Sequence, residues 1–158
     1  MDSSEFRTEI EAVSTEIRRI CEDLSPSVLE NVGLVASLEF LLTHIVENGK
    51  FAADESVEER IAFPMNVQLQ IYRIAQEVLT NINKHSNAAA VEMTVAMTAD
   101  NDFELKIRDD GTLFQPEGTR GRGRGIANIR SRADLINARV DWKERTKGGN
   151  VFILRKDS

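Results

Sequence analysis

The sequence contains few residues of the kinds that build cross-linked or metal-centred proteins. Its 158 residues include one cysteine, Cys21, and two histidines, His44 and His85. A single cysteine cannot form an internal disulfide bond, and such usage is typical of a reducing compartment. So few cysteines and histidines also argue against a structural zinc site. We therefore expect a cytoplasmic domain that is stabilised by its hydrophobic core, without disulfide bonds or a structural zinc ion.

Long apolar runs and an excess of positive charge are also missing. No apolar run reaches the length of a membrane span, and the chain does not open on a signal peptide. Any membrane attachment is therefore expected only through segments of a longer parent protein. The net charge of −6 argues against direct nucleic-acid binding, because nucleic-acid binders are normally basic. Six arginines still form a local basic island that suits a small anion: Arg120, Arg122, Arg124, Arg130, Arg132 and Arg139.

The composition that remains is that of an ordinary globular domain. Apolar residues make up 41% and charged residues 29% of the chain, which is long enough for one domain with a core. Residues 1–25 add a heptad pattern, which favours a dimerising helix over a helix packed on its own domain. The apolar positions of this seam are Phe6, Ile10, Val13, Ile17, Ile20 and Leu24.

The pattern after residue 26 predicts helices alternating with short strands. Consecutive strands imply antiparallel pairing, so we expect an α+β two-layer α/β sandwich, in which helices cover one face of a mixed sheet. The predicted elements are a helix over 33–48, a strand and connection over 50–63, a helix over 65–85, two strands over 91–97 and 103–109, a helix from about 126 to 136, and a hairpin of 140–145 with 150–156.

Three short motifs carry the candidate chemistry, and the first lies on the long helix. Glu77, Asn81 and Lys84 are spaced at i, i+4 and i+7, which places them on one face. Such a face is usually no more than a solvated polar surface. An asparagine is, however, a poor choice for a merely solvated position in mid-helix, and its amide oxygen is a ligand that Mg²⁺ accepts.

The second motif is the strand end "FELKIRDDG". Alternation puts Asp109 on the core side of the strand, following Phe103, Leu105 and Ile107. A carboxylate that faces a core needs a hydrogen-bond donor. Gly111 would let a backbone or a flat ligand approach closely. An Asp-Gly hairpin turn explains the glycine but not the position of Asp109.

The third motif is the glycine and arginine stretch "TRGRGRGIANIRSR". Gly121, Gly123 and Gly125 do not match a dinucleotide fingerprint, in which Ile126 would have to be glycine, and no P-loop lysine follows. A disordered arm would not continue directly into an amphipathic helix. The interpretation that remains is a flexible loop that ends at a helix N-terminus, where free N–H groups favour the binding of phosphate.

Together these motifs resemble the ATP-binding catalytic domain of two-component sensor histidine kinases, within the gyrase, chaperone, histidine-kinase and mismatch-repair ATPase superfamily. "QEVLTNINKH" is similar to the N box, "DDG" to the first glycine box and "GRGRGIANI" to the second. The helix "YRIAQE" and the junction "DLSPSVLENVGLVASL" resemble the nitrate-sensor-like subfamily. The resemblance divides the chain into the end of a dimerisation helix, residues 1–25, and an ATPase domain, residues 26–158.

The resemblance implies ATP and Mg²⁺ as ligands. Asn81 would hold Mg²⁺, Glu77 would lie beside the phosphates and polarise an acceptor or water, and Asp109 would accept a hydrogen bond from the adenine amino group. Residues 118–125 would form the lid. The other positions implied to bind ATP are Lys84, His85, Gly111, Gly121, Gly123, Arg124, Gly125, Ile126 and Asn150.

The chain also departs from the family pattern. Leu113 replaces a usual glycine, Arg124 a usual leucine and Asn150 a usual threonine. The segment before Ser25 contains no histidine that could accept the phosphoryl group, so we expect no autophosphorylation by the chain alone. In a parent kinase the resemblance implies a homodimer and a cognate response regulator. Two alternatives remain open, a serine kinase that binds a sigma factor and a degenerate, non-catalytic interaction module.

Overall fold

The computed structural model describes residues 27, 29–113 and 123–157. The proposed dimerisation helix of residues 1–25, the position of Gly121 and most of the proposed lid lie outside these ranges. The described elements are α2 (Leu34–Ile45), β1 (Gly49–Ala53), α3 (Val57–Arg60), α4 (Met65–His85), β2 (Val91–Met97), β3 (Asp102–Asp109), α5 (Gly123–Leu135), β4 (Arg139–Glu144) and β5 (Asn150–Asp157).

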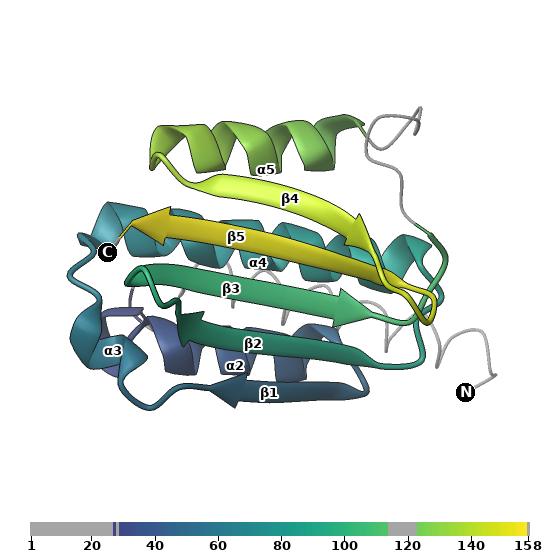
Figure 1. Cartoon of the computed structure of the whole chain (residues 1–158), viewed down its shortest axis with the longest axis horizontal. Coiled ribbons are helices and arrows are strands. Elements are labelled where there is room, and N and C mark those ends of the chain that lie inside the picture. Colours follow the sequence, from purple (N-terminus) through teal and green to yellow (C-terminus); the bar gives the residue numbers. More distant parts are fainter. Residues whose placement is uncertain (1–26, 28, 114–122, 158) are drawn as a thin grey trace, which may run out of the picture.

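The strands form one mixed sheet with the order β1-β2-β3-β5-β4. β1 pairs with β2 in parallel, and the other neighbours are antiparallel. The helices α2, α4 and α5 lie together on one side of this sheet (Figure 1). The predicted two-layer α+β sandwich is therefore confirmed.

Alternating side chains on the strands explain the single core. On β3 every second residue from Phe103 to Asp109 is buried, and the register places Leu105 beside Leu154 and Ile107 beside Phe152 on β5. The apolar stripe of α4, which includes Ile71, Ile74, Ala75 and Val78, packs against this face. Burial of these residues removes apolar surface from water at about 25 cal/mol per Å², the main force that holds the two layers together.

Asparagines follow both long helices near their C-termini. Asn87 follows α4 with a φ of 51°, and Asn137 follows α5 with a φ of 55°. Asparagine tolerates this left-handed conformation better than most residues, so it suits a helix end. Ser86, between the end of α4 and Asn87, accepts the N–H of Thr112 through its carbonyl oxygen at 2.6 Å, which joins the end of this helix to the turn after β3.

The prediction for residues 50–63 was incomplete. The strand occupies Gly49–Ala53 as expected, but the connection contains the short helix α3, Val57–Arg60. Glu58 of α3 accepts hydrogen bonds from the backbone N–H groups of Leu34 (2.8 Å) and Val35 (3.1 Å), and so it caps α2. Four residues are too few to show helical periodicity, which is why the pattern missed α3.

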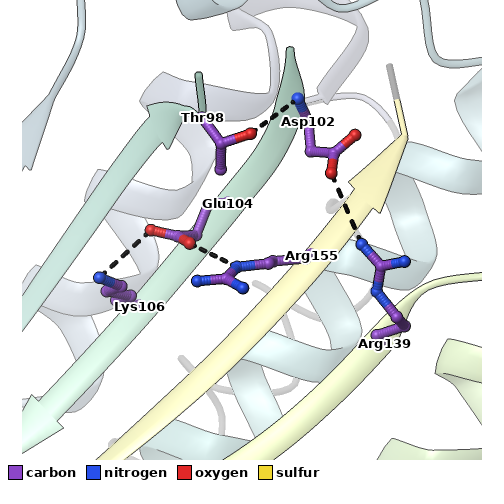
Figure 2. Close-up of polar contacts among 6 residues, drawn as sticks. All are labelled: Thr98, Asp102, Glu104, Lys106, Arg139 and Arg155. Carbon is purple, nitrogen blue, oxygen red and sulfur yellow. Dashed lines mark hydrogen bonds and ion pairs between the residues drawn. The ribbon is translucent and has the colours of Figure 1, made fainter. Parts of the chain in front are cut away.

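The other face of the sheet is polar, and none of the described helices lies over it. Figure 2 shows its central contacts, in which the carboxylate of Glu104 lies between Lys106 (3.3 Å) and Arg155 (2.6 Å). Arg139 on β4 reaches Asp102 on β3 at 3.5 Å. Burial opposes ionisation of Glu104, but the hydrogen bond from Arg155 and the charge of Lys106 prevail and lower its pKa. This face is therefore a solvated layer of charged cross-strand pairs.

Candidate nucleotide-binding site

A pocket opens between α4, α5 and the helix-covered face of the sheet. It encloses about 460 Å³, part of it open to solvent, and most of its wall is apolar. An apolar pocket with a few converging polar groups is typical of a ligand site. Four of the predicted site residues line it: Asn81, His85, Asp109 and Asn150. The apolar wall consists of Val78, Ile82, Ile107, Ile129, Trp142 and Phe152.

Asp109 is the buried carboxylate of this pocket, with 2% of its surface exposed. One of its oxygens, Oδ1, accepts hydrogen bonds from the Gly111 N–H (2.9 Å) and from Asn150 Nδ2 (3.2 Å). Burial nevertheless raises the pKa of Asp109, since these donors only partly offset the loss of solvation. The prediction that the core-facing Asp109 needs a donor is thus confirmed, and the carboxylate still has lone pairs for a ligand.

Asn150 fixes this carboxylate from the neighbouring strand. The register places it directly beside Asp109, and only 5% of its surface is exposed. Its Nδ2 also donates to the carbonyl oxygen of Thr112 at 2.8 Å. The asparagine that replaces the family's usual threonine therefore joins β5 to the turn after β3.

Gly111 permits a close approach, as predicted, but the group that approaches is backbone. A Cβ atom at Gly111 would lie 2.2 Å from the carbonyl oxygen of Ser86, and the same oxygen accepts the Thr112 N–H at 2.6 Å. Ser86 is itself buried, and its hydroxyl donates to the Ile82 carbonyl at 2.8 Å. The end of α4 is thus joined to the end of β3 beside the pocket.

The first turn of α5 places the third motif against the first. A Cβ atom at Gly125 would lie 3.1 Å from Asn81 Nδ2 and 3.5 Å from Glu77 Oε2. Within the described part of the chain, the side chains of Asn81 and Glu77 form no hydrogen bond. Their polar groups therefore remain available to a ligand at the N-terminus of α5.

This arrangement corrects the expected start of the helix. The helix begins at Gly123 and not near Ile126, so Gly123 and Gly125 belong to its first turn. At Gly125 a small residue lets α5 approach Asn81 of α4 closely. The lid role of residues 118–125 remains a prediction.

Of the other residues predicted to contact ATP, some line the pocket and others do not. His85 lines the pocket, whereas Lys84 is exposed and does not line it. Ile126 is 5% exposed and lies outside the pocket lining, so its place is in the packing of α5. The structure describes the backbone of Arg124 but not its side chain.

Sequence reasoning missed several pocket residues, of which Trp142 is the most useful. It is the only tryptophan of the sequence, and its ring centroid lies 5.3 Å from that of Phe152. Arg130 of α5 lies over the same ring, with its guanidinium carbon 5.5 Å from the ring centroid. The sequence predicted a hairpin strand over 140–145, but nothing in the pattern placed that strand beside the pocket.

The described residues contain neither a dense metal-ligand cluster nor a membrane-spanning helix. No group of three or more His, Cys, Asp or Glu side chains comes together within them, and none of their helices is both long and apolar enough to cross a bilayer. A divalent ion at this pocket would therefore need a ligand such as the Asn81 amide oxygen, with its other ligands coming from phosphates and water.

The fold and the pocket define an ATPase domain of a known class. The chain belongs to the family described as histidine kinase-, DNA gyrase B-, and HSP90-like ATPase, whose model matches residues 66–158. That range contains α4 except for its first residue, the three motifs, and the hairpin of β4 and β5.

Individual relatives agree with this membership. The chain is 32% identical over 74% of its length to the sensor histidine kinase MctS of Rhizobium johnstonii. It is also 23% identical over 95% of its length to the histidine-protein kinase/phosphatase DegS of Brevibacillus brevis. It covers only 26% and 39% of those two proteins.

Solved structures share the fold. The catalytic domain of histidine kinase ThkA matches with a TM-score of 0.61 and 14% identity, over 78% of this chain and 90% of that one. The blue-light activated histidine kinase of Erythrobacter litoralis matches with a TM-score of 0.63 and 17% identity, over 77% of this chain and 41% of that one. The resemblance inferred from the three motifs is therefore confirmed for family and fold.

Proposed function

We propose that this chain is the ATP-binding catalytic module of a sensor histidine kinase, which transfers the γ-phosphoryl group to a histidine of a dimerisation domain. The observation that carries the proposal is that Asn81 and Asp109 line one largely apolar pocket and that the first turn of α5 lies against Asn81. The kinase assignment is supported by the similarity to DegS and MctS, both of which are named as histidine kinases. The parent protein is proposed to be a cytoplasmic or membrane-anchored homodimer that passes the phosphoryl group to a response regulator.

In this proposal the buried end of the pocket selects adenine. Asp109 accepts a hydrogen bond from the exocyclic amino group, and Asn150 keeps the carboxylate in place. Ile107, Ile129 and Phe152 give the flat base an apolar surface. A guanine would instead place its carbonyl oxygen against the Asp109 carboxylate, and these two acceptors would repel each other.

The open end of the pocket then holds the phosphates. The free N–H groups at the N-terminus of α5 favour an anion, and this helix begins beside Asn81. The Asn81 amide oxygen suits Mg²⁺, which would neutralise the phosphate charge that develops during transfer. In this proposal Glu77, one turn earlier on α4 and also near Gly125, polarises the accepting imidazole or a water molecule.

The test supplies γ-labelled ATP and Mg²⁺ to the chain together with a histidine-bearing dimerisation domain in trans. We expect acid-labile, base-stable label on that domain and none on this chain, and the label should disappear with Asn81→Ala. Acid-stable label on serine would favour the serine-kinase alternative instead. If Trp142 fluorescence does not respond to ATP and calorimetry also detects no binding, the non-catalytic alternative is favoured.

A further inference from the structure

The polar face of the sheet carries a groove whose lining is mostly cationic. The groove runs over β3, β5 and β4 to the turn between β4 and β5 and encloses about 1030 Å³, much of it open to solvent. Among the described residues that line it, Glu144 alone is acidic. The cations are Lys106, Arg108, Lys143, Arg145, Lys147 and Arg155. This cluster of positive charge contrasts with the net charge of −6 of the whole chain.

Strand register creates this arrangement. Val151 of β5 lies between Arg108 of β3 and Lys143 of β4, and Ile153 lies beside Lys106. Ile153 is 9% exposed although no helix covers this face. The aliphatic stems of long cationic side chains can cover such an apolar floor while their charged ends remain in water. The groove therefore combines an apolar floor with a positive rim.

Ion pairs neutralise the cations at one end of the groove. Glu104 pairs with Arg155 and Lys106 at the end that Figure 2 shows. Toward the turn, the exposed Lys143 and Lys147 form no ion pair within the described ranges. The nearby carboxylates are those of Glu144, which lines the groove, of Asp141, which lies beside Ile153 on β4, and of Glu92, which lies beside Arg108 on β2. The cations without an ion pair are therefore the lysines around the β4–β5 turn.

The turn that carries these charges is held rigidly against the nucleotide pocket. The Arg145 side chain donates to the backbone carbonyl of Asp109 at 3.2 Å, and the Arg145 N–H donates to the Gly149 carbonyl at 3.0 Å. Gly149 has a φ of 101°, and a Cβ there would lie 2.0 Å from the same Asp109 carbonyl. A preorganised charged surface loses little entropy when a partner binds, which favours a recognition role.

We propose that this groove docks an acidic segment of a partner protein that carries apolar side chains among its carboxylates. Carboxylates would meet Lys143, Lys147 and Arg108, and the apolar side chains would rest on Val151 and Ile153. A nucleic acid fits less well, because none of the described lining residues is an aromatic that could stack on bases. The net charge of −6 would also repel a long polyanion.

The test measures fluorescence anisotropy of a short labelled peptide that alternates glutamate with valine. The groove variant is Lys143→Glu with Lys147→Glu, and the matched control is Lys50→Glu with Arg60→Glu, which changes net charge equally at exposed positions outside the groove. We expect the peptide to bind the wild-type chain and the control alike, and the groove variant about tenfold or more weakly. Unchanged thermal melting and ATP binding show that each variant is folded.

Three results would overturn the proposal. The first is no binding of the peptide to the wild-type chain, and the second is equal weakening in both double variants, which would reduce the effect to net charge. The third is tighter binding of an oligothymidylate of the same charge, which would identify a nucleic-acid surface. Weaker binding of an all-glutamate peptide than of the glutamate–valine peptide would support the role of the apolar floor.

Discussion

Asp109 concentrates a conflict between stability and binding at a single residue. It is buried, its pKa is raised by that burial, and its role in the proposal requires the ionised form. Asp110, the next residue, is exposed and accepts the N–H groups of Ala89 (2.8 Å) and Ala90 (3.0 Å), and these backbone bonds lower its pKa. Two adjacent aspartates therefore have separate tasks, one facing the ligand and one holding the backbone.

Replacing Asp109 with asparagine should weaken ATP binding by about ten- to a hundredfold, because a charge-assisted hydrogen bond is lost. The free energy of unfolding should not decrease, since a buried charge is removed while Asn150 can still donate to the amide oxygen. Trp142 fluorescence measures binding and urea unfolding measures stability. Asp110→Asn is the matched control and should leave ATP affinity unchanged. Equal loss of ATP and GTP binding in Asp109→Asn would refute the adenine role.

The pH dependence of binding and of stability should have opposite signs at Asp109. Because its folded pKa is raised, the native protein holds this proton more tightly than the unfolded chain. Its contribution to stability is therefore complete below the unfolded pKa and is lost as the pH rises through the folded pKa. ATP affinity should instead fall as the pH drops through that raised pKa. ATP titrations and urea unfolding of wild type and Asp109→Asn at a series of pH values test this. If the pH profiles of wild type and Asp109→Asn are parallel, the assignment of the pH dependence to Asp109 is contradicted.

At the scale of elements, the meeting of α5 with α4 depends on a residue without a side chain. Gly125→Ala should make α5 more stable by up to about 1 kcal/mol, because alanine is the better helix former. The added methyl would lie 3.1 Å from Asn81 Nδ2, so the amide must move and Mg-ATP should bind less tightly. Calorimetry with Mg-ATP and thermal melting measure the two effects.

Ser131→Ala is the control for this change, since it raises helix propensity at an exposed position of the same helix. It should stabilise α5 without any effect on binding. If Gly125→Ala binds Mg-ATP as tightly as wild type, the approach of α5 does not set the position of the Asn81 amide.

A second element-scale prediction concerns the start of α2. Gly33 precedes this helix with a φ of 87°, and the helix has no side-chain cap of its own. Glu58 supplies the cap from α3, so Glu58→Ala should lower the free energy of unfolding by about 1 kcal/mol while ATP affinity stays constant. Glu59→Ala, on the same short helix, should change neither. Urea unfolding decides, and equal losses in the two variants would show that capping is not the cause.

The sequence predicted the long elements and four residues that line the pocket, but not how the pocket is packed. The bounds of α4 and the burial of Asp109 follow from periodicity, since an apolar stripe and a strict alternation depend only on local geometry. The start of α5 could not be predicted from periodicity, because closely spaced glycines usually indicate a loop. Only the contact with a neighbouring helix explains a glycine within the first turn of α5. Ser86 and Trp142 were missed because their role arises from contacts between elements distant in sequence.

At the scale of the whole molecule, the sheet separates two surfaces with different chemistry. Its helix-covered face holds the apolar pocket, and its other face carries the cationic groove. The β4–β5 turn belongs to both, since Arg145 lines the groove and bonds to the backbone of Asp109. The ATPase fold can therefore present a partner surface without using any residue that faces the nucleotide.

The most direct test of nucleotide binding at this pocket is a calorimetric titration of ATP, with and without Mg²⁺, into the wild-type chain and Asn81→Ala. The wild-type chain should bind Mg-ATP, and Asn81→Ala should lose the Mg²⁺-dependent part of the affinity. Because Asn81 is only partly buried and lies outside the core, the fold should change by no more than about 0.5 kcal/mol. Absence of ATP binding by the folded wild-type chain, or equal Mg-ATP affinity in both proteins, would contradict the assignment.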